Sequence, residues 1–424
     1  MRAEVLTIGD EVLRGEIIDS NKSFLSERLL SLDIETHFHS SVRDEPEDIA
    51  DAFRRAAARA DVVLVSGGLG PTRDDLTVEV LARTFDRKLF RHEPSLAAIR
   101  AFFARVGREM AVVNEKQADL PEGAEALPNP LGTAPGCLLK VGETQIFCLP
   151  GVPGELRRMM EAEVLPRIAA RQGGRAVVRA RLLRTFGMGE PNLEEALSDV
   201  ARAGDVALGF RTAFPDNLLR PLTRAGTPAE ADARLETVCA AIRERLGALV
   251  YAEGDETMEA VAGRLLRAAG RTLAVAESCT GGLIGERITA VAGSSDYFLG
   301  GVVAYANAAK EKLLGVPGDL LREHGAVSEP VARAMAEGAR ARFGADLAVA
   351  TTGISGPGGG TPERPVGTVC IALAKADGVH TERFVFPLDR ARHRSLTAQI
   401  ALDWVRRSLL GEPLLAPSLL RRAR

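Results

Sequence analysis

The stretch that decides the fold of the C-terminal part of the chain runs from Leu273 to Lys310 and reads LAVAESCTGGLIGERITAVAGSSDYFLGGVVAYANAAK. Leu273 to Ala276 predict a buried strand, Glu277 to Gly282 form a turn of small residues, and an amphipathic segment that predicts a helix follows. Glycines at such a junction let the backbone approach a ligand, and the N–H groups of a helix start attract an anion. We therefore expect a cradle for a phosphate or a carboxylate at this turn.

The same stretch continues into groups that suit hydrolysis. A strand predicted at Gly301 to Ala306 carries Tyr305, and Asn307 opens a helix that contains Lys310. With Asn307 as the N-cap, Lys310 is the third helical residue and lies at the positive end of the helix dipole. That position, and burial, would lower the pKa of the lysine amine and leave part of it neutral, able to take a proton from a serine hydroxyl. The pattern predicts a Ser/Lys/Tyr hydrolase.

The sequence alone leaves the nucleophile open. Ser294 and Ser295 are adjacent, and Ser278 lies in the first turn. Cys279 stands beside the same glycines, but no histidine is near it in sequence, so we interpret it as a small buried residue rather than a nucleophile.

Composition sets the broad class. The 424 residues are enough for two or three domains, and 26% charged with 46% hydrophobic residues is typical of an ordinary globular protein. Lys+Arg 54 against Asp+Glu 57 gives a net charge of −3, which lacks the basic excess of a non-specific nucleic-acid binder. Five scattered cysteines without a C-x-x-C pair suggest neither a disulfide framework nor a zinc site. We see neither a membrane span nor a signal segment and expect a cytoplasmic protein.

Residues 1–168 alternate strand and helix, which predicts an open, doubly wound, mainly parallel α/β sheet. The expected strands and helices, in chain order, are Glu4 to Ile8, Ser23 to Leu32, Glu35 to Val42, Pro46 to Ala60 and Val62 to Val65. Ligands of such sheets bind outside the carboxyl ends of the strands. The turns at those ends are Gly9-Asp10-Glu11 and the stretch from Ser66 to Thr77.

Both turns combine glycine with carboxylates. Backbone N–H groups of such a loop can hold a phosphate, and carboxylates can bind a hard cation such as Mg²⁺. The candidate phosphate-binding residues are Gly67, Gly68, Gly70 and Thr72, and the candidate metal ligands are Asp10, Asp74 and Asp75. Asp74 can alternatively cap the helix that follows. The loops Leu127 to Gly136 and Leu149 to Glu155 are expected either to cover the site or to be plain turns.

Residues 172–250 read β-α-β-β-α-β, which predicts a small α+β domain of ferredoxin-like or KH-like kind. The elements are Ala176 to Thr185, Asn192 to Ala201, Val206 to Ala213, Asn217 to Arg224, Pro228 to Leu246 and Ala248 to Ala252. Gly187-Met188-Gly189-Glu190 is not the G-x-x-G clamp that a KH domain uses to hold nucleic acid. We therefore interpret this segment as a connecting or dimerising domain.

Residues 256–412 form the last predicted domain, again α/β. Helices are expected at Met258 to Ala269 and Pro330 to Phe343, and a strand at Asp346 to Thr351 leads into a loop with Gly353 and four further glycines up to Gly360. This loop and the Ser278 turn are expected to enclose a nucleotide-sized ligand at the sheet edge. Arg390 precedes the last helix and is a candidate phosphate ligand, because its planar fork suits phosphate oxygens; an exposed arginine without a partner is the alternative.

These motifs, in this order, resemble the CinA family, the competence- and damage-inducible protein A group, over nearly the whole chain. The motifs are Gly9 to Leu13, Ser66 to Thr77, Pro128 to Gly136, Leu149 to Gly154, Glu277 to Gly282, Ala292 to Ser295, Val327 to Pro330 and Pro365 to Val369. The resemblance implies a C-terminal amidohydrolase domain that converts nicotinamide mononucleotide to nicotinic acid mononucleotide and ammonia without a cofactor.

The resemblance also implies roles for particular residues. Carried over by position, the catalytic groups are Ser295, Tyr305 and Lys310. The substrate would be bound by Ser278, Thr280, Gly281 and Gly282. On this resemblance we favour Ser295 as the nucleophile.

The first domain is similar to molybdopterin-binding proteins of the MogA and MoeA type. In the family this domain is implicated in an ADP-ribose pyrophosphatase activity that needs a divalent metal, Mg²⁺ or Co²⁺. Molybdopterin binders usually read G-G-T-G, whereas this chain has Gly67-Gly68-Leu69-Gly70, which suits the pyrophosphatase better.

Two other functions stay open at this point. One is a molybdopterin-handling protein with a passive C-terminal domain, and the other is a non-enzymatic adaptor in DNA uptake or repair. We expect nucleotides as ligands, no direct nucleic-acid or membrane contact, and a homodimer.

Overall fold

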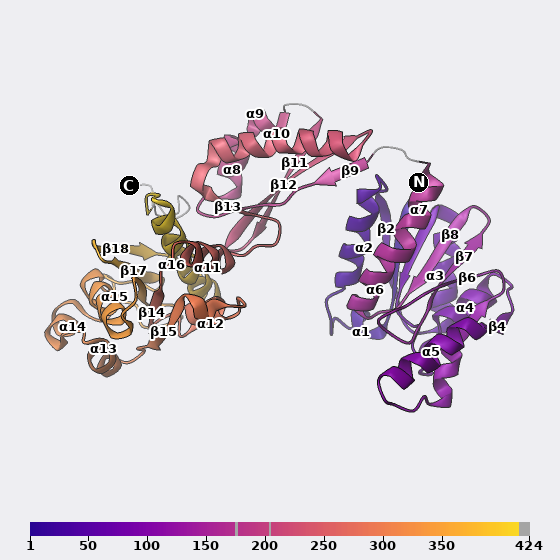
Figure 1. Ribbon diagram of the computed structural model, residues 1–424, viewed down its shortest axis with the longest axis horizontal. Helices are drawn as coiled ribbons and strands as arrows, with labels where there is room; N and C mark the ends of the chain where they lie inside the picture. Colours follow the sequence, from indigo (N-terminus) through magenta and orange to yellow (C-terminus); the bar gives the residue numbers. More distant parts are fainter. Residues whose placement is uncertain (174–176, 203–204, 415–424) are drawn as a thin grey trace. The chain divides into compact units, whose positions relative to one another are not determined.

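The computed structural model describes residues 1–173, 177–202 and 205–414. The chain divides into two compact units, one of Met1–Arg179 with Arg224–Asp232 and one of Ala180–Thr223 with Ala233–Arg424. Figure 1 shows the elements of each unit along the chain. No helix in the described ranges is both long and apolar enough to cross a bilayer.

The first unit is built on a six-stranded sheet with the order β2-β1-β3-β8-β7-β6. Strands β2, β1, β3 and β8 run parallel, while β7 and β6 are antiparallel to their neighbours. The strands are β1 (Ala3–Ile8), β2 (Thr36–Val42), β3 (Val62–Ser66), β6 (Glu125–Leu127), β7 (Gly136–Val141) and β8 (Thr144–Leu149). The predicted open, mainly parallel sheet is confirmed.

Helices cover both faces of this sheet because side chains of successive strand residues point to opposite sides. On one face the core joins the strands to α2, α6 and α7, and on the other to α3 and α4. These helices are α2 (Ser20–Ser31), α3 (Pro46–Arg59), α4 (Thr77–Thr84), α6 (Pro153–Met159) and α7 (Leu165–Gln172). An insertion between α4 and β6 adds β4 (Leu89–Arg91), α5 (Glu93–Arg105) and β5 (Asp119–Pro121).

The middle segment has the predicted β-α-β-β-α-β order, in a sheet β11-β12-β10-β13 with β9 beside β12. The expected first strand, Ala176 to Thr185, is two strands, and residue 176 lies outside the described residues. The elements are β9 (Val177–Ala180), β10 (Leu183–Thr185), α8 (Glu190–Ala196), α9 (Ser198–Arg202), β11 (Val206–Ala213), β12 (Asp216–Ala225), α10 (Pro228–Leu246) and β13 (Val250–Glu253).

The C-terminal sheet has the order β15-β14-β16-β17-β18, with β15, β14 and β16 parallel and the last two strands antiparallel. Its strands are β14 (Leu273–Glu277), β15 (Phe298–Val303), β16 (Leu347–Gly353), β17 (Thr368–Lys375) and β18 (Gly378–Val385). Its helices are α11 (Met258–Ala268), α12 (Leu283–Thr289), α13 (Asn307–Leu314), α14 (Gly318–His324), α15 (Glu329–Phe343) and α16 (Arg390–Leu410).

The two faces of this sheet differ in side-chain size. Strands β14 and β16 both begin Leu-Ala-Val-Ala and pair in register, Leu273 beside Leu347. Their leucines and valines pack with α11, α12 and α16, whereas their alanines pack with α13, α14 and α15. Small side chains on the second face let alanine-rich α15 approach the strands closely, so the three-layer sandwich is set by the period-2 pattern.

Two boundaries near the predicted site differ from the sequence expectation. Strand β15 ends at Val303 and not at Ala306, and α13 begins at Asn307 with Ala306 as its N-cap. Asn307 adopts helical backbone instead of capping with its side chain. Lys310 is therefore the fourth helical residue, still within the first turn.

In the first unit, Gly67 is a position where a side chain would clash with the backbone. Gly67, directly after β3, has φ +110°, and a Cβ there would lie 2.1 Å from the carbonyl oxygen of Ile8. Gly107 also has positive φ, +67°, but a Cβ there meets nothing within 4 Å. The close approach of β1 and β3 at their carboxyl ends therefore requires glycine at position 67.

We expect Gly67→Ala to destabilise the first unit by about 1–3 kcal/mol from strain plus the clash, and Gly107→Ala by about 1 kcal/mol from backbone strain alone. The measurement is amide hydrogen exchange of peptides from residues 1–170, because the single tryptophan and all three tyrosines lie in the second unit. Equal effects of the two substitutions would contradict the close approach.

Candidate active site

A lysine and a serine meet at the carboxyl end of the C-terminal sheet. The Lys310 amine lies 3.1 Å from the Ser278 hydroxyl oxygen and donates to the carbonyl oxygens of Ala304 at 2.8 Å and Tyr305 at 3.1 Å. Ser278 follows β14, and Ala304 follows β15, which runs parallel to it. The same edge of the sheet thus supplies the serine, the carbonyls and the start of the lysine helix.

Lys310 is held in surroundings that disfavour its charge. Its side chain is 1% exposed, and among the described residues no carboxylate forms an ion pair with it. Burial lowers the pKa of Lys310, and the neighbouring Cys279 thiol acts in the opposite direction. Burial without an anionic partner shifts the amine toward its neutral form, which is the state a general base needs.

Cys279 is not a nucleophile in this arrangement. Burial raises the pKa of its thiol to about 12, so the thiolate is not populated at neutral pH. The interpretation of Cys279 as a buried residue is consistent with this environment.

Within the chain the structure pairs Lys310 with Ser278 and not with Ser295, and the catalytic role of Ser295 stays a prediction. Ser295 lies before β15, and Tyr297, two residues later, accepts a hydrogen bond from the N–H of Leu273 at the beginning of β14. Ser278 lies at the other end of the same strand. With about 3.3 Å per residue, a strand of this length separates the two serines by more than about 15 Å. Ser294 precedes β15 as well.

The anion expected at the start of α12 is a side chain of the protein itself. The Glu277 carboxylate accepts hydrogen bonds from the N–H groups of Gly282 at 2.9 Å, Ile284 at 3.1 Å and Gly285 at 2.9 Å. The prediction that these N–H groups hold a ligand is therefore wrong, because Glu277 already occupies them. In doing so it fixes the turn that presents Ser278.

Tyr305 and Arg390 form the exposed rim. The Lys310 amine contacts the Tyr305 backbone oxygen, whereas the tyrosine hydroxyl accepts a hydrogen bond from Arg390 at 3.2 Å. Arg390 also donates to the Gly356 carbonyl in the glycine-rich loop at 3.0 Å. That loop follows Gly353, the last residue of β16, whose neighbour is Val369. Tyr305 thus lies beside the candidate site without its hydroxyl contacting the lysine.

Sequence reasoning missed three groups that hold the walls of the site. Arg394 donates to the Thr280 carbonyl at 2.7 Å, and the Thr280 hydroxyl pairs with that of Thr351 at 2.7 Å. Fully buried His393 lies 2.9 Å from the Ser355 hydroxyl and ties α16 to the glycine-rich loop. Burial lowers the pKa of His393. The sequence signal was a helix start reading Arg-Ala-Arg-His-Arg beside the aspartate at its N-cap.

The N-terminal unit has a separate cavity at the carboxyl ends of β1, β3 and β8, with a volume of about 380 Å³. The predicted Gly67, Gly68 and Gly70 line it, as do Asp74 and Asp75. Asp44, which the sequence analysis did not single out, also lines it, and burial followed by nearby carboxylates raises its pKa. The cavity is lined by glycine backbone, as the loop predicts.

The three predicted metal ligands do not form a common set. The Asp10 carboxylate pairs with Arg14 and Arg43, which holds its pKa below the usual value. Asp74 and Asp75 instead accept hydrogen bonds from Thr72. Across the described residues no group of three or more His, Cys, Asp or Glu side chains is placed to hold a metal ion. The arrangement does not fit a three-carboxylate cation site.

Comparisons with known proteins agree with this layout. Residues 4–170 match the probable molybdopterin binding domain, residues 180–252 the damage-inducible protein CinA KH domain, and residues 255–409 the CinA C-terminal domain. The fold and site thus define a three-domain α/β protein with a molybdopterin-binding-like first domain.

Full-length relatives extend the match. A CinA-like protein of Geobacter sulfurreducens is 46% identical over 97% of this chain and 100% of its own. One from Citrifermentans bemidjiense is 46% identical over 97% of this chain and 98% of its own. A crystal structure of a competence/damage inducible protein from Agrobacterium tumefaciens is 40% identical over 36% of this chain and 95% of its own, with a TM-score of 0.35. The chain belongs to the CinA family.

Replacing Lys310 by methionine tests whether the buried amine destabilises the folded protein. Because the folded-state pKa of Lys310 is below its ordinary 10.5, burying the protonated amine costs stability at neutral and acid pH, and this cost vanishes as pH rises toward 10.5. We expect Lys310→Met to raise Tm at pH 7 by roughly 2–4 °C, with a smaller gain at high pH. Differential scanning calorimetry at several pH values measures this.

The matched control is Lys312→Met, an exposed lysine on the same helix, for which no pH-dependent gain is expected. A Lys310→Met protein that is less stable than the wild type at pH 7 would show that the lysine is not held against its charge.

Proposed function

We propose that the C-terminal domain is an amidohydrolase that converts nicotinamide mononucleotide to nicotinic acid mononucleotide and ammonia. The observation that carries the proposal is the buried Lys310 amine, 3.1 Å from the Ser278 hydroxyl, at the ligand-binding edge of an α/β sheet. A hydroxyl beside an amine whose pKa is lowered by burial can be activated as a nucleophile. The choice of substrate rests on the resemblance of the chain's motifs to the CinA family.

In the proposed reaction Ser278 is the nucleophile, in place of Ser295. Its oxygen attacks the amide carbon, and Lys310 takes the hydroxyl proton. The protonated lysine then gives that proton to the leaving nitrogen, so ammonia departs and an ester to Ser278 remains. Water, with Lys310 again as base, hydrolyses the ester to the carboxylate and restores the serine.

The negative oxygen of the tetrahedral intermediate needs hydrogen-bond donors. In the turn after Ser278, the N–H groups of Gly281 and Leu283 donate to backbone carbonyls, and those of Gly282, Ile284 and Gly285 donate to Glu277. We assign the N–H groups of Cys279 and Thr280, which in this structure approach the Cys279 sulfur, to the oxyanion. Such donors are worth about 3–4 kcal/mol each in comparable enzymes.

Arg390 and Tyr305 are proposed to contact the substrate rather than to transfer protons. Arg390 is an exposed guanidinium at the rim of the site and can meet the nucleotide phosphate, for which its planar fork is suited. The Tyr305 hydroxyl, which already pairs with Arg390, would orient it.

For the N-terminal domain we propose binding and hydrolysis of ADP-ribose at the cavity beside Gly67, Gly68 and Gly70. The support is a cavity of about 380 Å³ lined by glycine backbone where open α/β sheets bind ligands. A divalent metal, Mg²⁺ or Co²⁺, is part of this proposal through the family resemblance. No reaction step is derived through it, because the carboxylates are not arranged as a ligand set.

Two serine variants test the deamidase directly. Ser278→Ala should lower ammonia release from nicotinamide mononucleotide by about 10²–10⁴-fold or more, because it removes the nucleophile that the lysine activates. Ser295→Ala is the matched control and should keep turnover within twofold of the wild type. Product identity is read by mass. The assignment fails if Ser295→Ala is the inactive variant, or if the wild type releases no ammonia.

Filling the N-terminal cavity tests the second proposal. Gly151 lines the cavity, whereas Gly154, three residues on, does not line it, and a Cβ there meets nothing within 4 Å. We expect Gly151→Phe to weaken ADP-ribose binding at least about tenfold by exclusion of the ligand, and Gly154→Phe to leave it unchanged. Isothermal titration measures the affinity, and ammonia release by both variants should remain normal. Unchanged ADP-ribose binding by Gly151→Phe would show that the ligand does not bind in this cavity.

A further inference from the structure

Helix α16 carries part of the proposed active site at its beginning and contacts the middle domain farther along, while its apolar side packs on the C-terminal sheet. Its first two turns carry Arg390, His393 and Arg394, described above. Farther along, Arg406 donates to the Ala248 carbonyl of the middle domain at 2.6 Å. Even near its start, the Arg392 guanidinium lies 5.8 Å from the ring centre of Phe214, in the β11–β12 hairpin.

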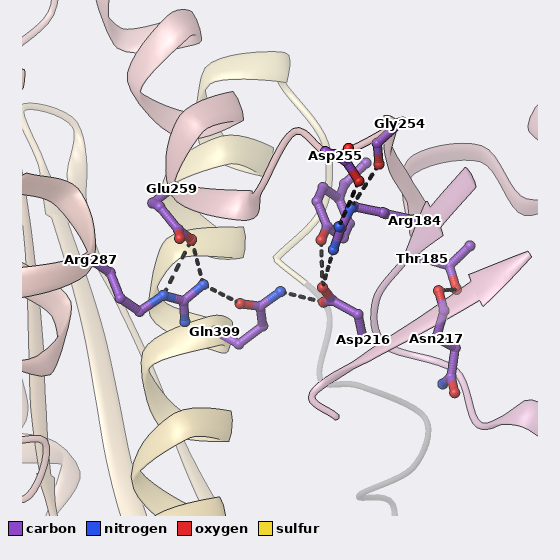
Figure 2. A network of polar contacts seen from close by, with 10 residues as sticks. Arg184, Thr185, Asp216, Asn217, Gly254, Asp255, Glu259, Arg287 and Gln399 are labelled. Carbon is purple, nitrogen blue, oxygen red and sulfur yellow. Dashed lines mark hydrogen bonds and ion pairs between the residues drawn. The ribbon is translucent and has the colours of Figure 1, made fainter. Parts of the chain in front are cut away.

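A series of buried and half-buried polar groups joins that hairpin to α16 and α12 (Figure 2). The Gln399 amide of α16 donates to the Asp216 carboxylate at 2.6 Å and accepts from Arg287 of α12 at 2.6 Å. Arg287 also donates to Glu259 of α11 at 2.6 Å. Because the amide oxygen faces a hydrogen-bond donor and the amide nitrogen faces an acceptor, the orientation of the Gln399 amide is fixed.

In the middle domain, this series of polar contacts ends at Asp216. Its side chain is 8% exposed, it accepts a hydrogen bond from Tyr251 at 2.6 Å, and Arg184 lies 3.6 Å away. Burial raises the pKa of Asp216, the Tyr251 hydroxyl, Arg184 and Arg287 oppose the rise, and Glu259 adds to it. The carboxylate is thus a buried group whose direct partners come from strands β10 and β13 of the middle domain and from helix α16 of the C-terminal domain.

Few residues separate Asp216 from the proposed reacting groups. Gln399 is five residues beyond Arg394 on the same helix, about 7.5 Å along its axis. Arg394 in turn holds the Thr280 carbonyl, two residues after Ser278. Arg287 lies on α12, whose first N–H groups are bound by Glu277. Both helices that border the serine turn therefore share the Gln399 contact.

We propose that Asp216 of the middle domain is a positioning residue for the C-terminal active site, because its ionised carboxylate fixes Gln399 and thereby holds α16 against α12. The proposal rests on the proposed deamidase for its effect on turnover, and on the geometry of α16 alone for its effect on structure. The middle domain then stabilises the hydrolytic site through α16. Protonation of Asp216 weakens the hydrogen bond to Gln399 and loosens the helix that carries Arg390 and Arg394.

Turnover is tested with Asp216→Asn in the full chain, which keeps the shape of the side chain and imitates its protonated form. We expect kcat/KM for nicotinamide mononucleotide to fall about fivefold at neutral pH, mainly through KM, because Arg390 and Arg394 shift. The wild-type to variant ratio should approach one at acid pH, where the wild-type carboxyl is protonated as well. Effects of Lys310 titration cancel in this ratio.

The control is Asp205→Asn, an exposed aspartate of the same domain whose side chain is 75% accessible, which should match the wild type at every pH. Gln399→Met removes both hydrogen bonds of the amide and should reproduce the neutral-pH loss, which keeps the test decisive if Asp216→Asn folds poorly. A ratio within twofold of one at all pH values for both variants overturns the proposal.

Hydrogen exchange separates this proposal from the proposed function. We expect Asp216→Asn and Gln399→Met to speed amide exchange at least threefold in peptides from residues 283–289 and 390–399, and not in α15. If the wild type releases no ammonia while these peptides respond, the deamidase proposal fails and the positioning role stands. If the peptides do not respond, the positioning role fails whatever the enzyme does.

Discussion

The constraint on which the C-terminal half depends is the burial of the Lys310 amine between a serine hydroxyl and two backbone carbonyls. Among the residues that the structure describes, no carboxylate offsets the desolvation of an ammonium group in that place, so burial lowers the pKa of the amine. The arrangement requires two parallel strands that end side by side, one followed by the serine and the other by the lysine helix. The order of the strands in this sheet therefore determines whether the lysine amine can meet the serine hydroxyl.

Helix α16 extends that requirement to the middle domain. Its apolar side completes the face of the sheet made by leucines and valines, its first turns hold the glycine-rich loop and the serine turn, and its later turns receive the middle domain. Two arginines near its end, Arg406 and Arg407, are almost fully buried and share Asp403. A helix with so many polar partners is held in one position, which is why a contact far from Ser278 can affect the position of α16.

Local sequence rules were sufficient for most of the fold. The alternation of strands and helices and the placement of Lys310 in a first helical turn followed from periodicity and residue type. The proposed nucleophile did not, because Ser278 and Ser295 differ in which end of strand β14 they lie near, and the family resemblance favoured Ser295. The rule that parallel strands present their carboxyl ends at one edge would have favoured Ser278. Partners far apart in sequence were also missed: Arg43 lies 33 residues from the Asp10 that it binds.

The carboxylate of Glu277 has a chemical consequence for molecules meant to block this site. Because that side chain saturates the N–H groups at the start of α12, an added phosphate or carboxylate on a blocking compound would gain no backbone donors there and would be repelled by the resident anion. Under the proposed mechanism, an electrophile such as a boronic acid, which would form a reversible covalent bond to the Ser278 oxygen, is the better chemistry for blocking this site.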